Sequence, residues 1–386
     1  MPVPDGFIPL CVPDIQGNAW AYVKECLDTN WVSSVGPFVD RFEREVAEYV
    51  GARYAVAAVT GTAALHVALL AAGVQPDDEV LVSTLTFIAP VNAIRYCNAW
   101  PVFVDAEPDS WQMDAGKAAD FLEHGCRLEN GELRNKATSR RVRTILPVHI
   151  LGHPVDMDPI LELARRYQLP VIEDATEALG ACYKDRRTGS LGDIACFSFN
   201  GNKIITTGGG GMIVTNHESW AKRAKYLTTQ AKDDPLEYIH NEIGYNYRLT
   251  NLQAALGCAQ MEKLDEHIAA KRRIADTYQA AFADTAGITP MPQAAWASSI
   301  FWMYTVLVDE AEYGMDSRAL LRKLEAAGIQ SRPLWQPVHL SPAHAGHAYA
   351  CPVAEDLYRR ALSLPCSVGL TAAQQAKVIE VVKGQR

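Results

Sequence analysis

Short apolar runs alternate with helical patterns along most of this 386-residue chain. Three of the runs are YAVAAV at 54–59, VIED at 171–174 and CFSF at 196–199. Strands with so few polar positions are typical of a sheet that helices cover on both faces. The alternation therefore predicts an α/β fold with a mostly parallel main sheet.

A lysine and an aspartate stand at the ends of two of these runs. Lys203 follows CFSFNGN, and Asp174 ends VIED. Taken singly, a lysine in a Gly-rich turn is ordinarily solvated, and an acid at a strand end can cap the next helix. Together they suit pyridoxal phosphate (PLP), which needs an amine for its aldehyde and a carboxylate beside its protonated pyridine nitrogen. Asp174 would lie at the carboxyl edge of the sheet, with Glu173 pointing to the opposite face.

The turn after the first run is suited to binding a phosphate. After YAVAAV, Thr60, Gly61 and Thr62 lead into the helical segment AALHVALLAAG. The start of a helix offers free backbone N–H groups and a positive dipole end, which favour an anion. Thr62 could instead simply cap the helix. The glycines at 208–211 have no helix after them, which favours a turn over a phosphate cradle.

With these residues identified, the chain resembles the PLP-dependent nucleotide-sugar aminotransferases of the DegT/StrS type over nearly its whole length. Five ordered blocks carry the resemblance: WVSSVGPFVDRFEREVAEYVGARYAVAAVTGTAALHVAL, STLTFIAPVNAI, VIEDATEALGACYK, GDIACFSFNGNKIITTGGGGMIVTN and GYNYRLTNLQAALG. The resemblance implies a fold-type I PLP-dependent transferase that works as a homodimer. We expect a large, mostly parallel sheet domain with the N-terminal segment at 1–255 and a smaller α+β domain at 256–386, linked by a helix from Asn251 to about Phe282.

The same resemblance implies roles for the residues that hold the cofactor. Lys203 would form the Schiff base with PLP, and Asp174 would pair with its pyridine nitrogen. Many members carry Gln three residues after this aspartate, whereas this chain has Glu177, as perosamine-type enzymes do. A carboxylate lies against the ring oxygen of PLP only if one of the two keeps a proton. Some relatives that deoxygenate sugars carry His in place of the lysine, so Lys203 favours amino transfer.

Further cofactor contacts follow from the resemblance. The backbone N–H groups of Gly61 and Thr62 and the hydroxyl of Ser198 would hold the phosphate. Phe87 would stack over the PLP ring, although alone it reads as an ordinary core residue. Asn246 would reach across a dimer interface to the phosphate of the neighbouring subunit.

Residues that contact the substrate are less distinct in the sequence. Trp31, His339 and Arg332 are the candidates for substrate binding, and Arg248 is a further basic residue that could meet a diphosphate. A loop histidine such as His339 is more often solvated, and an arginine is more often a surface residue.

The block FSFNGNKIITTGGGG is most similar to that of 4-aminotransferases in the bacillosamine and legionaminic acid routes. This resemblance implies that the protein transfers the amino group of L-glutamate to C4 of UDP-2-acetamido-2,6-dideoxy-hexos-4-ulose. Lys203 would act first as general base and then as general acid. One alternative is a GDP-perosamine synthase, which uses GDP-4-keto-6-deoxymannose. Another alternative is a non-catalytic protein that binds PLP or a sugar nucleotide and acts in regulation.

Charge and composition exclude several other classes. The net charge of -9 disfavours nucleic-acid binding. The N-terminus lacks a secretory pattern, and no apolar run approaches the length of a membrane span. Nine cysteines without a CxxC pair predict reduced thiols in a cytoplasmic enzyme. The pairs His149 with His153 and His344 with His347 do not have the spacing of a metal site, so we expect no metal.

Overall fold

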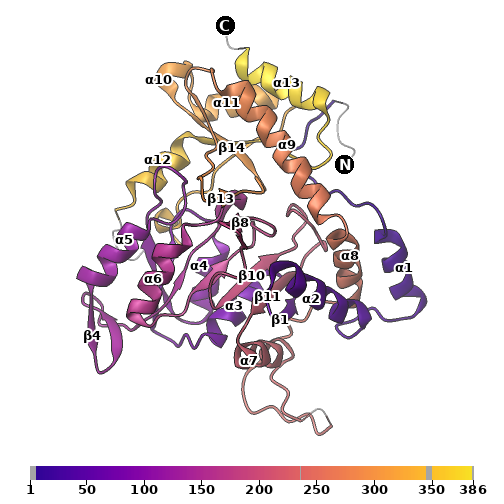
Figure 1. The fold of residues 1–386 in the computed structure, drawn as a ribbon, viewed down its shortest axis with the longest axis vertical. Helices are drawn as coiled ribbons and strands as arrows, with labels where there is room; N and C mark the ends of the chain where they lie inside the picture. The colour runs from indigo at the N-terminus through magenta and orange to yellow at the C-terminus, as the bar shows by residue number, and fades with distance from the viewer. Residues whose placement is uncertain (1–5, 235, 345–349, 385–386) are drawn as a thin grey trace.

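The computed structural model describes residues 6–234, 236–344 and 350–384 (Figure 1). Its main sheet has the strand order β3-β2-β6-β7-β10-β11-β1, because parallel bridges from Ile145 to Val171 and from Val148 to Asp174 join β6 to β7. The strands are β1 (Tyr54–Ala58), β2 (Glu79–Ser83), β3 (Trp100–Val104), β6 (Val142–Leu146), β7 (Ile172–Asp174), β10 (Ile194–Ser198) and β11 (Gly211–Thr215). Of these seven strands, β11 alone runs in the direction opposite to the other six. The prediction of a mostly parallel α/β sheet is confirmed.

Helices cover the sheet on both faces. All five residues of β2 and of β11 are buried, and successive strand residues point to opposite faces. The helices of this part are α1 (Ala19–Asp28), α2 (Pro37–Val50), α3 (Gly61–Ala71), α4 (Ala89–Tyr96), α5 (Ala115–Asp120), α6 (Met157–Tyr167), α7 (Glu218–Thr228) and α8 (Asn251–Met261). The apolar helix α3 lies against β10 and β11 and is buried along most of its length.

Three strand ends meet at one edge of the main sheet. Both β1 and β10 are antiparallel to β11, and β10 is parallel to β7, so all three strands run in one direction. Their carboxyl ends therefore lie at the same edge of the sheet, with the start of β11 between those of β1 and β10. This arrangement brings together the segments 59–62, 174–177 and 198–203, which carry most of the predicted cofactor contacts.

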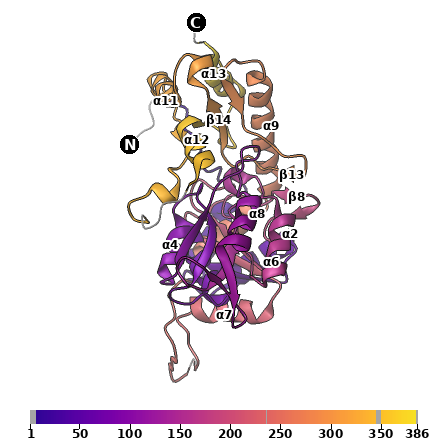
Figure 2. The ribbon, with the colours of Figure 1, turned by 90° about the vertical axis from the view of Figure 1, so that its left-hand side faces the viewer.

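The C-terminal part forms a smaller unit above the main sheet (Figures 1 and 2). Its antiparallel sheet has the order β12-β14-β16-β15. The elements are α9 (Leu264–Phe282), β12 (Ile288–Pro290), β14 (Tyr304–Val308), α10 (Glu310–Tyr313), α11 (Ser317–Ala326), β15 (Arg332–Pro333), α12 (Pro352–Arg360), β16 (Ala361–Leu364) and α13 (Ala372–Lys383). Ile8 pairs with Ile329, so the described start of the chain lies against this C-terminal unit.

The expected single helix from Asn251 to about Phe282 is wrong in one respect. The chain turns at Glu262 and Lys263, which separates α8 from α9. No Gly or Pro marks this break in the sequence. Instead, the Glu262 carboxylate accepts hydrogen bonds from Asn18, Tyr22 and Arg41, which fasten the turn to α1 and α2. The predicted division between residues 255 and 256 falls inside α8 and stays a prediction.

Short elements complete the described structure. They are the π-helical turn Phe121–Gly125, the hairpin of β4 (Cys126–Glu129) and β5 (Glu132–Asn135), the 3-10 turns Ile150–Gly152 and Val338–Leu340, and the small sheet of β8 (Cys182–Tyr183), β9 (Arg186–Arg187) and β13 (Ala297–Ser298). All nine cysteines are free thiols, and all but Cys11 and Cys182 are buried. In the described ranges, no helix has the length and apolar character needed to cross a membrane.

Candidate active site

A cavity of about 300 Å³ opens at the edge of the main sheet where the three strand ends meet. Six residues predicted from the sequence line it: Gly61, Thr62, Phe87, Glu177, Ser198 and Lys203. Eight further residues complete the lining: Thr60, Leu65, Ala89, Thr176, Asn200, Asn202, Trp302 and Trp335. Its size lies at the lower end of small-molecule pockets.

The turn after β10 holds Lys203 in this cavity. The Lys203 N–H donates to the carbonyl of Asn200 at 3.0 Å, which closes the turn. The side chain is only 13% exposed, so the alternative of a solvated lysine is wrong. Its Nζ lies 3.3 Å from Oε1 of Glu177 and 4.1 Å from the centre of the Trp302 ring. One face of the amine is thus held by a carboxylate and another by an aromatic surface.

Asp174 and Glu173 point in opposite directions, as the strand periodicity predicts. Asp174 is buried, and Oδ1 accepts the N–H of Thr176 at 3.1 Å. Burial raises the pKa of the Asp174 carboxyl, while hydrogen bonds from Thr176 and the charge of Lys203 oppose that change. A cation placed beside Asp174 would therefore stabilise its ionised form.

Glu173 has a structural role on the other side of β7. Its carboxylate accepts the backbone N–H groups of Gly189, Leu191 and Gly192 at 2.7 to 2.9 Å. The N–H of Val155 donates to Nδ1 of His149, so the Nε2–H of that ring donates to Glu173 at 3.0 Å. Burial acts to raise the pKa of Glu173, but these hydrogen bonds hold it below the usual range.

Glu177 bridges Lys203 and a strained turn. Its Oε2 accepts the N–H of Leu151 at 2.9 Å. Leu151 has a φ of 60°, a left-handed conformation that L residues other than Gly seldom adopt. Burial raises the pKa of Glu177, and the charge of Lys203 opposes this rise. Glu177 can therefore take up a proton at a higher pH than an exposed glutamate.

The start of α3 has the geometry of an anion site. Thr60, not Thr62, caps the helix, because the Thr60 side chain accepts the N–H of Ala63 at 3.0 Å. The N–H groups of Gly61 and Thr62, in the first turn, have no acceptor within the helix. A Cβ on Gly61 would lie 2.8 Å from Cβ of Ser198 and 3.3 Å from Cγ2 of Thr176. Only glycine lets the helix start approach Ser198 this closely.

Aromatic side chains from both parts of the chain border the cavity. Phe87 is 55% exposed, so the alternative of an ordinary core residue is wrong. Trp302 and Trp335 come from the C-terminal part and lie nearly parallel, with an interplanar angle of 11°. The indole N–H of Trp302 donates to the carbonyl of Asn202 at 2.7 Å. Neither tryptophan was predicted from the sequence, because no local motif places it near Lys203.

Five predicted residues are not among those that line the cavity: Asp174, described above, and four others. Asn246 is exposed and pairs with Thr229 at the base of a projecting segment, and Trp31 is half-exposed. Arg332 is an exposed residue of β15. The ring of His339 lies 2.6 Å from the Thr84 hydroxyl, and its side chain is 4% exposed, so the solvated alternative is wrong.

Arg248 is neither a surface residue nor a free diphosphate ligand. Its guanidinium is buried, lies 2.7 Å from Oε1 of Glu43 and donates to the carbonyl of Ala57 at 2.9 Å. These contacts tie the segment before α8 to α2 and β1.

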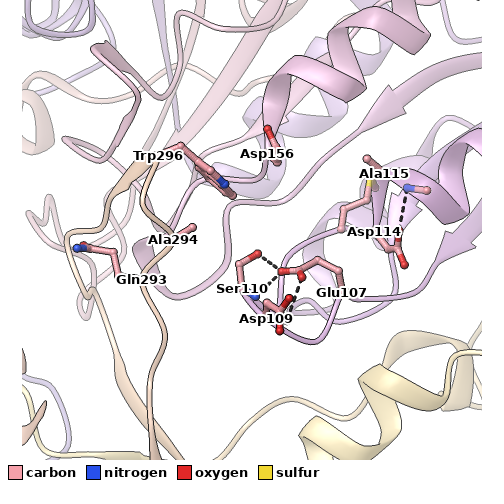
Figure 3. A pocket seen from close by; sticks show the side chains of 11 residues that line it. Glu107, Asp109, Ser110, Asp114, Ala115, Asp156, Gln293, Ala294 and Trp296 are labelled. Atoms are coloured by element: carbon pink, nitrogen blue, oxygen red, sulfur yellow. Dashed lines mark hydrogen bonds between the residues drawn. The ribbon is translucent and has the colours of Figure 1, made fainter.

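A second cavity, of about 490 Å³, lies away from Lys203 (Figure 3). Figure 3 shows Glu107 hydrogen-bonded to Ser110 and Asp109, with Asp156 and Trp296 on the opposite wall. The acidic side chains on both walls of this cavity already have hydrogen-bond partners within the protein. Asp114 caps α5, and Asp156 accepts a hydrogen bond from the hydroxyl of Tyr183. Its negative charge disfavours a phosphate.

The histidine pairs do not form a metal site in the described structure. The His153 ring contacts the carbonyl of Pro154 and the N–H of Ala294, so both of its nitrogens are used within the protein. His347 lies outside the described residues. Among residues 6–234, 236–344 and 350–384, no group of three or more potential ligands is placed to hold a metal ion.

The residues of the first cavity, together with Asp174 at the end of β7, fit PLP. An amine, a buried carboxylate that a cation would stabilise, and a helix start made accessible by Gly61 lie at one sheet edge. These features match the aldehyde, the pyridine nitrogen and the phosphate of that cofactor. The fold and site together define a PLP-dependent transferase of fold-type I.

Comparisons with known proteins identify the family. The pattern of the DegT/DnrJ/EryC1/StrS aminotransferase family matches residues 13–383. The chain is 43% identical to a GDP-perosamine synthase of Caulobacter vibrioides, over 96% of each chain, and 39% identical to one of Escherichia coli O157:H7, over 97% of this chain and 98% of the other. It superimposes on S. venezuelae DesV, solved with a ketimine intermediate, with a TM-score of 0.86 and 33% identity over 96% and 95% of the two chains. The chain belongs to the DegT/DnrJ/EryC1/StrS aminotransferase family and is a PLP-dependent nucleotide-sugar aminotransferase.

Proposed function

We propose that the protein transfers the amino group of L-glutamate to the C4 keto group of GDP-4-keto-6-deoxymannose, the reaction of a GDP-perosamine synthase. The observation that carries this choice is the set of three relatives with that name, at 43%, 39% and 34% identity over nearly the whole chain. Glu177 agrees with it, because the sequence resemblance places Glu at this position in perosamine-type enzymes. The UDP-linked sugar expected from the FSFNGNK block has no comparable support.

In this proposal the cavity residues divide the work of binding the cofactor. The N–H groups of Gly61 and Thr62 and the Ser198 hydroxyl hold the phosphate, and Phe87 covers the ring. When bound, PLP supplies an aldehyde that captures the donor nitrogen and a ring that accepts the electron pair released at the donor α carbon. Asp174 keeps the ring nitrogen protonated, and that proton in turn keeps the buried carboxylate ionised.

Lys203 moves the proton in both halves of the reaction. Its Nζ would remove the proton from the α carbon of glutamate as a general base and deliver it to the former aldehyde carbon of the cofactor as a general acid, and the same amine would run this transfer in reverse towards C4 of the sugar. Glu177, at 3.3 Å, and the Trp302 ring, at 4.1 Å, position this amine. The raised pKa of Glu177 suits a residue that shares a proton with a neighbouring oxygen or amine.

The proposed functional unit is a homodimer in which Asn246 serves the partner subunit. Exposed apolar residues support an interface, among them Trp20 at 77% and Val35 at 69%. The segment after α7 projects from the body of the molecule (Figures 1 and 2) and exposes Ile243 at 83%. Asn246 lies at the base of this segment, outside the cavity of its own chain.

Two experiments test the proposal. Purified enzyme with L-glutamate is offered GDP-4-keto-6-deoxymannose, UDP-2-acetamido-2,6-dideoxy-hexos-4-ulose and a dTDP-linked 4-keto sugar, and products are identified by mass. Higher kcat/KM for the UDP-linked or dTDP-linked sugar would overturn the assignment of the acceptor.

Mixed dimers test the role of Asn246. Lys203→Ala and Asn246→Asp subunits, each inactive alone, are mixed after reversible dissociation. If Asn246 acts across the interface, the mixed dimer regains one complete site, and a random mixture reaches about a quarter of wild-type activity. Activity no higher than that of the Asn246→Asp protein would place Asn246 outside the partner's site.

A further inference from the structure

A buried lysine binds two cysteines behind the active site. Lys271, in α9, is 2% exposed. Its Nζ donates to the carbonyl of Trp302 at 2.8 Å and lies 3.4 Å from Sγ of Cys11 and 3.5 Å from Sγ of Cys366. A buried ammonium is costly unless it is paired with a negative group, and a thiolate is the group that these contacts offer.

The two cysteines lie on neighbouring stretches of backbone. The N–H of Cys366 donates to the carbonyl of Leu10 at 2.8 Å, and the N–H of Val12 donates to the hydroxyl of Ser367 at 3.1 Å. Both sulfurs lie within 3.5 Å of the same Lys271 ammonium. Rotation of the two side chains can therefore bring the sulfurs together to close a disulfide.

The charges around the pair make the two sulfurs unequal. The hydrogen bond from Cys366 and the ammonium of Lys271 lower the pKa of Cys11 to about 5, against the opposing effect of burial, and Lys203 adds a smaller contribution in the same direction. The hydrogen bond to Cys11 and burial raise the pKa of Cys366. Cys11 is half-buried and Cys366 is buried. One sulfur is thus a partly accessible thiolate, and the other is a protected thiol beside it.

We propose that Cys11 and Cys366 form an oxidisable pair, in which Cys11 is the thiolate that reacts with a hydroperoxide and Cys366 closes a disulfide. In the first step the Cys11 sulfur takes one oxygen of hydrogen peroxide, and the other oxygen leaves as water with a proton from solvent. In the second step the Cys366 sulfur displaces that oxygen from Cys11 and a second water leaves. The two sulfurs lose two electrons, and the peroxide gains them.

The pair supports the turn that carries Lys203. Sγ of Cys11 lies 3.5 Å from the carbonyl oxygen of Asn202, the residue before Lys203. Trp302, whose carbonyl binds Lys271, donates its indole N–H to the same Asn202 carbonyl. A disulfide would remove the thiolate that balances Lys271 and would change the support beneath the active-site turn.

The first test measures the reactivity of Cys11 in reduced holoenzyme. Iodoacetamide labelling is followed by peptide mass analysis at pH 6.5 and pH 8.5. Between these values an ordinary thiol with a pKa near 8.5 gains about 50-fold in thiolate and in rate, whereas Cys11 should change less than about twofold. Cys182 is the control, because it is the other half-buried cysteine, and its sulfur hydrogen-bonds to the carbonyl of Gly180 rather than lying beside a buried ammonium.

The second test follows the disulfide itself. Holoenzyme is treated with hydrogen peroxide, blocked with N-ethylmaleimide and digested without reductant, and a peptide linking Cys11 to Cys366 that dithiothreitol releases is expected. Cys366→Ser should leave Cys11 as a sulfenic acid that dimedone traps. Lys271→Met, checked by its melting temperature, should slow labelling of Cys11 at pH 6.5 at least tenfold. Faster oxidation of Cys182 than of Cys11, or loss of Cys11 to peroxide without the linked peptide, would overturn the proposal.

Discussion

Replacing Gly61 with alanine tests the phosphate site most directly. The added Cβ would lie 2.8 Å from Cβ of Ser198 and 3.3 Å from Cγ2 of Thr176. Carbon atoms in ordinary contact are about 3.5 to 4.0 Å apart, so the start of α3 and the end of β10 must separate by about 0.7 Å or more. The proposed phosphate donors on Gly61, Thr62 and Ser198 would separate with them.

The structure sets the size of the expected effect. Crowding a well-packed site with one methyl group costs about 1 to 3 kcal/mol. If this free energy destabilises the PLP-bound state relative to the apoprotein, affinity for PLP decreases about 5- to 150-fold, since 1.4 kcal/mol corresponds to a factor of ten. Gly201→Ala is the matched control, because a Cβ on Gly201 meets no atom within 4 Å although it lies in the same loop as Lys203.

The assay is a titration of each apoprotein with PLP, followed at about 400 nm, where the lysine-bound cofactor absorbs. The melting temperatures of the two apoproteins are measured in parallel, which separates a loss of stability from a loss of binding. If Gly61→Ala binds PLP within a factor of two of Gly201→Ala, the helix start is not the phosphate site and this reasoning is wrong.

Three further variants give distinct outcomes. Lys203→Ala should keep the fold, as judged by circular dichroism, and lose turnover, whereas normal turnover would refute its role. Glu177→Gln removes a carboxyl group, and burial raises the pKa of that group in the folded protein. A group with a raised pKa stabilises the folded state at pH values below its unfolded pKa, near 4.3, and this stabilisation is lost as the pH rises. The melting temperature of the wild-type apoprotein should therefore fall relative to Glu177→Gln as pH rises from about 4, and a constant difference would contradict the shift. Arg248→Met leaves Glu43 without its closest partner and should lower the unfolding free energy in urea by about 3 kcal/mol with PLP affinity unchanged, so a selective loss of substrate binding would contradict a structural role.

Local sequence patterns were sufficient to predict which segments meet at much of the cofactor site. The segments around Gly61, Asp174 and Lys203 each combine an apolar strand with the turn that follows it, and parallel strands bring such turns to one edge. The roles of these residues in binding PLP stay predictions, but their convergence on one sheet edge follows from strand direction. The opposite orientations of Glu173 and Asp174 follow in the same way from the two-residue period of a strand.

Contacts between distant segments were not accessible to the same reasoning. Nothing near Trp302 in the sequence indicates that its ring would lie against Lys203. The sequence around Arg248 is typical of a surface residue, and only the packing of α2 and β1 shows that it is buried. The break between α8 and α9 depends on Glu262 meeting Arg41 and Tyr22, which lie more than two hundred positions away.

The sequence alone determined the class of fold and the cofactor chemistry and predicted the main residues of the PLP site, because strand and helix periods and turn residues act over a few positions. Only the tertiary structure decided which C-terminal side chains close the cavity and that Cys11, Lys271 and Cys366 meet. Such meetings depend on how the C-terminal unit and the N-terminal segment pack on the sheet, and packing is a property of surfaces assembled from the whole chain.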